Sequence, residues 1–149
     1  MCSKVKGSAQ SYFSSLESTT RRGSDEIHQS FVLPGGLHRA AVEIAFREGD
    51  MLKNLIAIAI GKMVERLDGV ENKDKEDISF TFDPEEKMVH TSAYLPKELI
   101  VNLRKVAHYM SINKQVIIAY GLTDLLLQEY GEKYPDLVCP IKEYIIRKA

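Results

Sequence analysis

His28-Gln-Ser-Phe-Val-Leu-Pro-Gly-Gly-Leu37 recurs later in the chain as His90-Thr-Ser-Ala-Tyr-Leu-Pro-Lys-Glu-Leu99. Aligned without a gap, residues 28–67 and 90–129 share eight identities in forty positions. Apolar character is also kept at many other aligned pairs, such as Ile44 and Val106. Because a repeat of this length corresponds to one supersecondary unit, the sequence predicts two copies of that unit in one chain.

Each copy begins with a short alternating run that ends at Leu-Pro, which is typical of a strand closed by a turn. We expect these strands over residues 27–33 and 88–95. A helix with one apolar stripe follows in each copy, and then a second helix that is apolar on nearly every face. The expected stripe residues are Leu37, Ala41, Ile44 and Ala45 in the first copy and Leu99, Leu103, Val106 and Met110 in the second.

Neither unit is expected to be stable alone, because a single strand makes no sheet and an all-round apolar helix must be covered. Pairing the strands antiparallel and crossing the second helices satisfies both needs. The predicted fold class is therefore α+β, mostly helical, with two strand-helix-helix units related by a pseudo-twofold axis and a two-stranded antiparallel ribbon.

Changes in composition divide the rest of the chain. Residues 1–26 are rich in Ser, Thr and basic residues and are predicted to be a disordered arm. Unit 1 covers residues 27–68, an acidic linker covers 69–87, and unit 2 covers 88–130. A helical tail over 131–149 carries Ile141, Tyr144, Ile145 and Ile146, and we expect its apolar face to pack either on the core or on a partner. Alternation over Ile78–Phe82 indicates a short extra strand, and residues 27–149 are expected to form one compact domain.

Charge and composition indicate which partners the protein can bind and argue against a membrane protein. The chain has 149 residues, is 44% hydrophobic and carries a net charge of −1. Residues 69–86 hold seven acidic and two basic side chains, so the remainder has an excess of four positive charges. The longest purely apolar stretch, residues 55–60, is too short for a membrane helix, so we expect a cytoplasmic protein with no membrane partner.

Catalytic and cofactor signals are weak. Gly61-Lys62 would need a glycine at Ile56 and a Ser or Thr at Met63 to make a phosphate-binding loop. Cys2 and Cys139 have no partner at metal-ligand spacing. We therefore predict a protein that is not an enzyme and that uses no metal or cofactor.

The order strand-helix-helix, with Leu-Pro at the strand end and Asn113 at the start of the second helix, resembles the ribbon-helix-helix family of DNA-binding proteins. The resemblance covers residues 27–67 and 88–130. In that family the ribbon enters the major groove and its outward side chains read base edges. With Leu33 and Leu95 facing the core, the resemblance implies base contacts by His28, Ser30, Val32, His90, Ser92 and Tyr94.

The resemblance also implies phosphate contacts at the start of each second helix, where free N–H groups and the helix dipole favour an anion. The implied residues are Asn113, Lys114 and Gln115 in unit 2 and Lys53 in unit 1. Asp50 is predicted to cap the unit 1 helix, and its negative charge should weaken the phosphate contact there.

Fusion of two unlike units in one chain predicts a monomeric pseudo-dimer that reads a non-palindromic double-stranded site. The tandem arrangement resembles that of accessory factors in T-DNA or conjugative DNA processing and transfer. Relaxase or partition-type transfer proteins are then candidate partners, and self-association on DNA stays open. Two alternatives remain: a transcriptional or plasmid copy-number repressor, and an antitoxin-like or adaptor module that binds protein.

Overall fold

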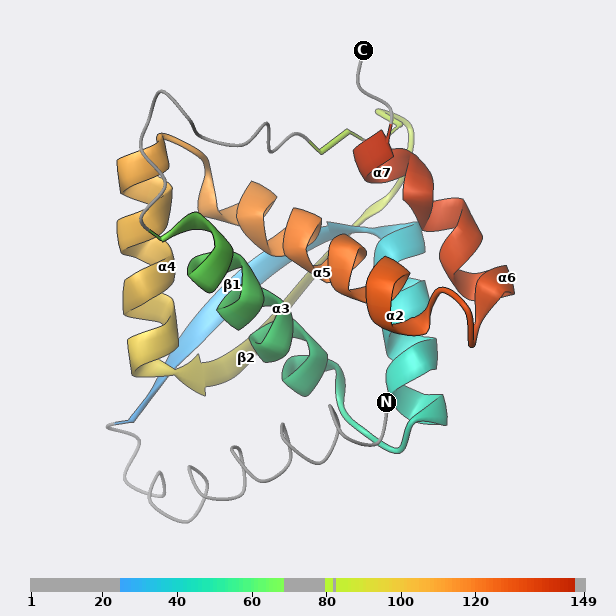
Figure 1. Cartoon of the computed structure of the whole chain (residues 1–149), viewed down its shortest axis with the longest axis horizontal. Coiled ribbons are helices and arrows are strands. Elements are labelled where there is room, and N and C mark those ends of the chain that lie inside the picture. The colour runs from blue at the N-terminus through green and yellow to red at the C-terminus, as the bar shows by residue number, and fades with distance from the viewer. Residues whose placement is uncertain (1–24, 69–79, 82, 147–149) are drawn as a thin grey trace.

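The computed structural model describes residues 25–68, 80–81 and 83–146. The strand-helix-helix order occurs twice in it (Figure 1). The elements are β1 (Glu26–Pro34), α2 (Gly35–Arg47), α3 (Leu52–Leu67), β2 (Met88–Pro96), α4 (Lys97–Met110) and α5 (Lys114–Tyr130). Short helical segments follow, namely α6 (Pro135–Val138), η3 (Cys139–Lys142) and α7 (Glu143–Ile146). The prediction of an α+β, mostly helical fold with a two-stranded antiparallel sheet is confirmed.

Some predicted segments lie outside these ranges. The arm over 1–26 is described only at its last two residues, and the linker over 69–87 only at 80–81 and 83–87. The extra strand predicted over residues 78–82 also falls mostly outside. Its described members, Phe80 and Thr81, lie in no strand.

The two strands form a ribbon whose register is symmetric about one residue pair. Ser30 lies opposite Ser92, and these are equivalent positions of the repeat. At one end the Gly35 N–H donates to the Lys87 carbonyl at 2.9 Å, and at the other the Lys97 N–H donates to the Asp25 carbonyl at 2.9 Å. The same bond thus closes both ends of the ribbon, because the two donors are equivalent positions of the repeat and so are the two acceptors.

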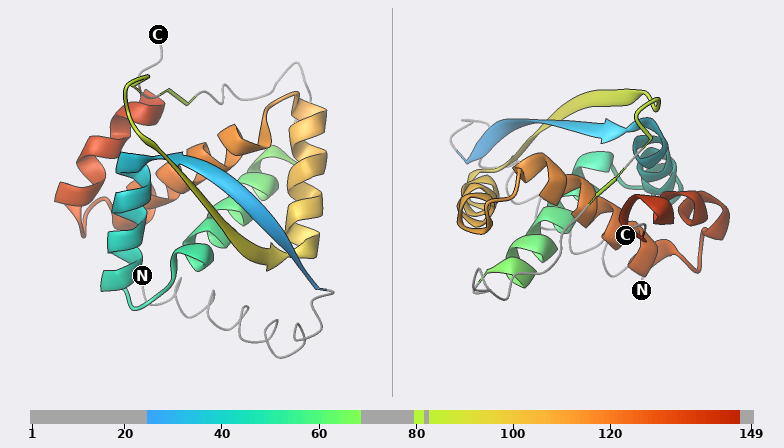
Figure 2. Two further views of the ribbon diagram at one scale, coloured as in Figure 1. Left: turned by 180° about the vertical axis from the view of Figure 1, so that it is seen from behind. Right: turned by 90° about the horizontal axis from the view of Figure 1, so that it is seen from above.

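The central helices α3 and α5 cross on one side of the ribbon, with α2 and α4 at its two ends (Figures 1 and 2). The crossing is close at Gly121, where an added Cβ would lie 2.6 Å from the Met63 Cγ and 3.2 Å from the Ala59 carbonyl oxygen. Only glycine allows this approach. Ala59 and Gly121 are again equivalent positions of the repeat, so small residues meet where the two copies touch.

The core fills the space between the ribbon and the four longer helices. Phe31, Leu33 and Leu95 contribute from the ribbon and are fully buried. The predicted stripe of α2 is buried and includes Ala40 as well. On α4 the stripe runs through Ile100 rather than Leu99, which is only partly buried. The two helices begin at equivalent positions, Gly35 and Lys97, so the difference lies in the side chains: unit 2 has the apolar Ile100 where unit 1 has His38.

The C-terminal tail packs on the core. Val138, Ile141 and Tyr144 are buried in the same hydrophobic cluster as the two units. The Tyr144 hydroxyl donates to the Glu86 carboxylate at 2.7 Å, and the same oxygen accepts the Gly36 N–H at 2.8 Å. Burial and this bond to Glu86 raise the pKa of Tyr144 well above its usual range. Glu86, just before β2, therefore links the tail to the start of α2.

Candidate nucleic-acid interface

The outer face of the ribbon collects the six residues predicted to read bases. His28, Ser30, His90, Ser92 and Tyr94 are exposed, and Val32 is half-buried. The register places them as three cross-strand pairs, His28 with Tyr94, Ser30 with Ser92, and Val32 with His90. Figure 2 (right) shows the ribbon along one side of the molecule, with the helices on its other face. The structure thus brings all six side chains together on one open surface.

The two halves of this surface differ. The His28 imidazole shares a hydrogen bond of 3.0 Å with the Ser92 hydroxyl, between Nε2 and Oγ. The same ring packs edge-on against Tyr94 with 5.2 Å between centroids. His90 instead lies opposite Val32, whose side chain offers no polar group. The ribbon therefore presents an ordered polar cluster at one end and a histidine beside an aliphatic side chain at the other.

The start of α5 is capped and joined to β1. The Asn113 side chain accepts the Gln115 N–H at 2.7 Å. The Gln115 amide accepts from the Val32 N–H at 3.1 Å and donates to the Ser30 carbonyl at 3.1 Å. The side chain of Gln115, which is predicted above to contact phosphate, thus holds β1 against α5. Lys114 supplies the positive charge here, with its Nζ 3.5 Å from the Gln29 amide oxygen.

A hollow of about 410 Å³ opens beside the start of α5. Its charged and titratable side chains are Arg104, His108 and Lys114, and its wall includes the Asn113 cap. Cationic groups beside the positive end of a helix dipole make a favourable place for an anion such as phosphate. We call this the basic corner. Arg104 and His108 are not among the residues predicted from the sequence, although their four-residue spacing on one helix face was a usable signal.

The corner between α2 and α3 has the same backbone but other side chains. The Asp50 N–H donates to the Ala45 carbonyl at 2.8 Å, and at the equivalent positions of unit 2 the Ile112 N–H donates to the Ala107 carbonyl at 3.0 Å. Each turn also has one residue in the left-handed region, Gly49 with a φ of 72° and Ser111 with a φ of 57°. The chain therefore makes one turn twice.

The cap of α3 differs from the prediction. Its N-cap is Met51, which makes no side-chain cap bond, and the predicted cap Asp50 lies one residue earlier. The Asp50 carboxylate accepts the Met51 N–H at 2.8 Å and also the Asn54 amide. Lys53, predicted to contact phosphate, is half-buried as the second residue of α3. An acidic side chain thus stands at this helix start, where unit 2 has Ile112.

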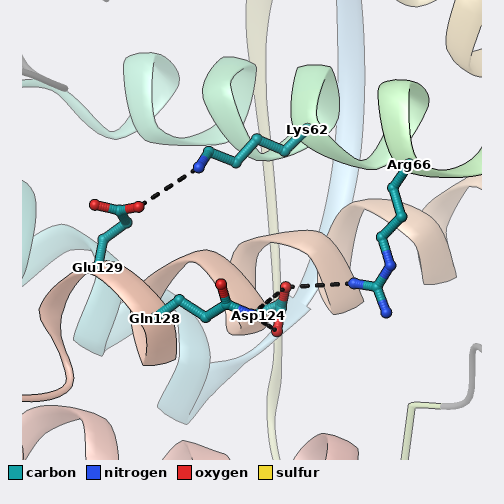
Figure 3. Close-up of polar contacts among 5 residues, drawn as sticks. All are labelled: Lys62, Arg66, Asp124, Gln128 and Glu129. Carbon is teal, nitrogen blue, oxygen red and sulfur yellow. Dashed lines mark hydrogen bonds and ion pairs between the residues drawn. The ribbon is translucent and has the colours of Figure 1, made fainter.

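The face away from the ribbon carries paired charges. The Lys62 ammonium lies 3.5 Å from the Glu129 carboxylate, and the Arg66 guanidinium lies 3.5 Å from that of Asp124 (Figure 3). Gln128 donates to the same Asp124 carboxylate at 3.1 Å. Exposed pairs of this kind add little stability, but they neutralise the cations of this face. The ribbon side, with the basic corner at its edge, is therefore the better nucleic-acid candidate.

Residues 25–68, 80–81 and 83–146 contain neither a group of metal ligands nor a helix that could span a membrane. No cluster of three or more metal-ligating side chains occurs there. Among the helices over these same residues, none has both the length and the apolar character that crossing a bilayer requires. Comparison of the chain with protein-family models, curated proteins and solved structures finds no match to any of them.

Proposed function

We propose that this chain is a pseudo-dimeric ribbon-helix-helix protein that binds double-stranded DNA, with its ribbon in the major groove. The observation that carries the proposal is the open outer face of the ribbon, where the members of three cross-strand pairs alternate with buried residues on β1 and with half-buried residues on β2. A two-stranded ribbon is one of the elements that the major groove admits. The symmetric register and the repeated turn support two equivalent units related by a pseudo-twofold axis.

The six outward side chains suit base reading by hydrogen bonds and apolar contact. Histidine and serine both donate and accept, so His90 and Ser92 can pair with N7, O6 or amino groups at base edges. Tyr94 adds a hydroxyl and an apolar ring, and Val32 can contact a thymine methyl group. Because the two strands carry different side chains, the preferred site is non-palindromic.

The electrostatic contribution to DNA affinity comes from residues outside the ribbon. None of the six outward residues is lysine or arginine. The basic corner, with Arg104 and Lys114, provides the main phosphate contact, and the α3 start provides little because of Asp50. With about two phosphates neutralised, log K should fall against log salt with a slope of about −2.

A directional site fits an accessory factor in T-DNA or conjugative DNA processing, which must mark one side of a transfer border or origin. Relaxase or partition-type transfer proteins are its natural partners. A transcriptional or plasmid copy-number repressor would use the same ribbon. The two roles differ only in where the site lies, so mapping the bound genomic or plasmid fragments separates them.

Fluorescence anisotropy tests DNA binding directly. A labelled random duplex and a duplex enriched by the protein itself are titrated with wild type, with His90→Ala/Ser92→Ala/Tyr94→Ala, and with Lys62→Ala as a control on the opposite face. Wild type and the control should prefer the enriched duplex. The triple variant should lose about 100-fold or more of that preference, since each good base contact contributes about 1–3 kcal/mol.

Two outcomes contradict the proposal in different ways. An unchanged preference in the triple variant would remove the ribbon as the reading surface. Absence of binding by wild type at low salt would reject DNA as the ligand and favour the adaptor alternative. That second function has its own supporting observation, because Phe46 and Met51 are large apolar side chains exposed at the unit 1 corner.

A further inference from the structure

Three large apolar side chains are exposed at the α2–α3 corner. Val42 is 40% exposed, Phe46 77% and Met51 58%. Val42 and Phe46 lie one turn apart on the same face of α2, and Met51 follows the turn that ends this helix. We call these three residues the apolar corner patch.

The patch occupies the places that form the basic corner in unit 2. The alignment of the two copies pairs Val42 with Arg104, Phe46 with His108 and Met51 with Asn113. Those three counterparts line one hollow, and the two turns share their backbone bonds and left-handed residue. The three apolar side chains therefore also lie together. They offer a phosphate neither charge nor a hydrogen bond, so their exposure fits a protein partner instead.

One exposed ion pair lies beside the patch on α2. The Arg47 guanidinium donates to the Glu43 carboxylate at 2.8 Å, and both side chains are exposed. When two α2 helices lie antiparallel about a twofold axis, Phe46 of each meets the apolar face of the other. Glu43 of each copy then faces Arg47 of the other, so the surface is complementary to itself.

From this arrangement we infer that the apolar corner patch binds a second copy of this chain, patch against patch. A net charge of −1 sets no strong repulsion between copies. Three side chains cover far less than the roughly 1,000 Å² of a stable interface, so the association is weak and requires a high protein concentration. It involves neither the ribbon nor the basic corner.

Sedimentation equilibrium of the full chain without DNA tests this surface. Over about 10 μM to 1 mM, the range of a weak association, the weight-average mass of wild type should rise from monomer toward dimer. Phe46→Asp should weaken the dimer at least tenfold, because it places a charge in the apolar contact. His108→Asp, the same change at the equivalent position of unit 2, should leave it unchanged. Wild type that stays monomeric throughout, or a Phe46→Asp dimer as strong as wild type, would overturn the inference.

Cysteine cross-linking tests the geometry. Phe46→Cys is made in a chain with Cys2→Ser and Cys139→Ser, and Tyr109→Cys, which is also exposed, is the matched control. Under mild oxidation at high concentration, the Phe46→Cys chain should form a disulfide-linked dimer several times faster than the control. Equal rates would mean random collision and would contradict the patch-against-patch contact.

Other occupants give different results. If residues 1–24 cover the patch, wild type stays monomeric and their deletion allows dimers, which rejects the inference for the intact chain. Failure of the proposed DNA binding can be distinguished from failure of this inference. Loss of DNA binding would appear in the anisotropy assay and would not change the sedimentation or cross-linking results.

Discussion

The two corners of the molecule share one backbone and differ in almost every exposed side chain. At the α4–α5 corner, Asn113 caps the helix and Arg104 and Lys114 supply positive charge. At the α2–α3 corner, Met51 stands at the cap position and Phe46 is exposed. The turn and the buried stripe are kept in both because they form the core. The exposed positions are free to diverge, so one corner suits an anion and the other an apolar partner.

Removing the basic corner should give the largest loss of sequence-independent DNA binding. Arg104→Ala/Lys114→Ala should weaken binding to random and enriched duplexes alike by about 30-fold near 0.1 M salt and flatten the salt slope by about two units. Lys105→Ala, an exposed cation on the same helix, is the control. A loss confined to the enriched duplex would show that these residues read bases instead. Anisotropy at several salt concentrations makes the measurement.

Grafting the basic corner onto unit 1 is the converse change. Val42→Arg/Phe46→His/Met51→Asn copies the three side chains of unit 2 onto the equivalent places. Affinity for random duplex should rise about tenfold at low salt, with a salt slope steeper by about one unit. The same titrations measure it. Unchanged affinity would mean that the α2–α3 corner does not approach DNA at all.

The caps should change stability in opposite directions. Asn113→Ala removes the bond to the Gln115 N–H and should lower the free energy of unfolding by about 1 kcal/mol. Met51→Asn supplies a cap that α3 lacks and should raise it by a similar amount. Urea unfolding followed by circular dichroism measures both. If Met51→Asn is neutral, the Asp50 carboxylate already satisfies this helix start.

The left-handed turn residues should give the smallest effect. Ser111 has a φ of 57°, where glycine is favoured, so Ser111→Gly should stabilise the fold by about 0.5–1 kcal/mol. Gly49→Ser, the reverse change at a φ of 72°, should destabilise it by about the same amount. The same urea experiment applies. If both substitutions raise the free energy of unfolding, or both lower it, the two turns are not equivalent.

The sequence predicted the parts of the fold that follow from local periodicity. Strand alternation alone placed His28, His90 and Tyr94 on the open face, because successive side chains of a strand point to opposite sides. The α4 stripe was less accurate, because the repeat aligns Leu99 with the buried Leu37, whereas in α4 the buried residue is Ile100.

Contacts between distant segments could not be predicted. The bonds from Gln115 to β1 join residues of different units, and the Glu86 bond to Tyr144 ties a loop to the tail. Neither set of hydrogen bonds produces a periodic pattern in the sequence. The difference between the two corners could have been predicted, because the alignment of the two copies pairs Phe46 with His108. A repeat is recognised by its matching positions, whereas the functional difference between these corners lies in the positions that do not match.

The most direct test is chemical-shift mapping of the isotope-labelled full chain with the enriched duplex. Binding by the ribbon and the basic corner predicts large amide shifts in β1, β2 and the first turn of α5, with much smaller shifts at the α2–α3 corner. Shifts centred on the α3–α5 face that carries Lys62 and Asp124, or equal shifts at the two corners, would contradict the account.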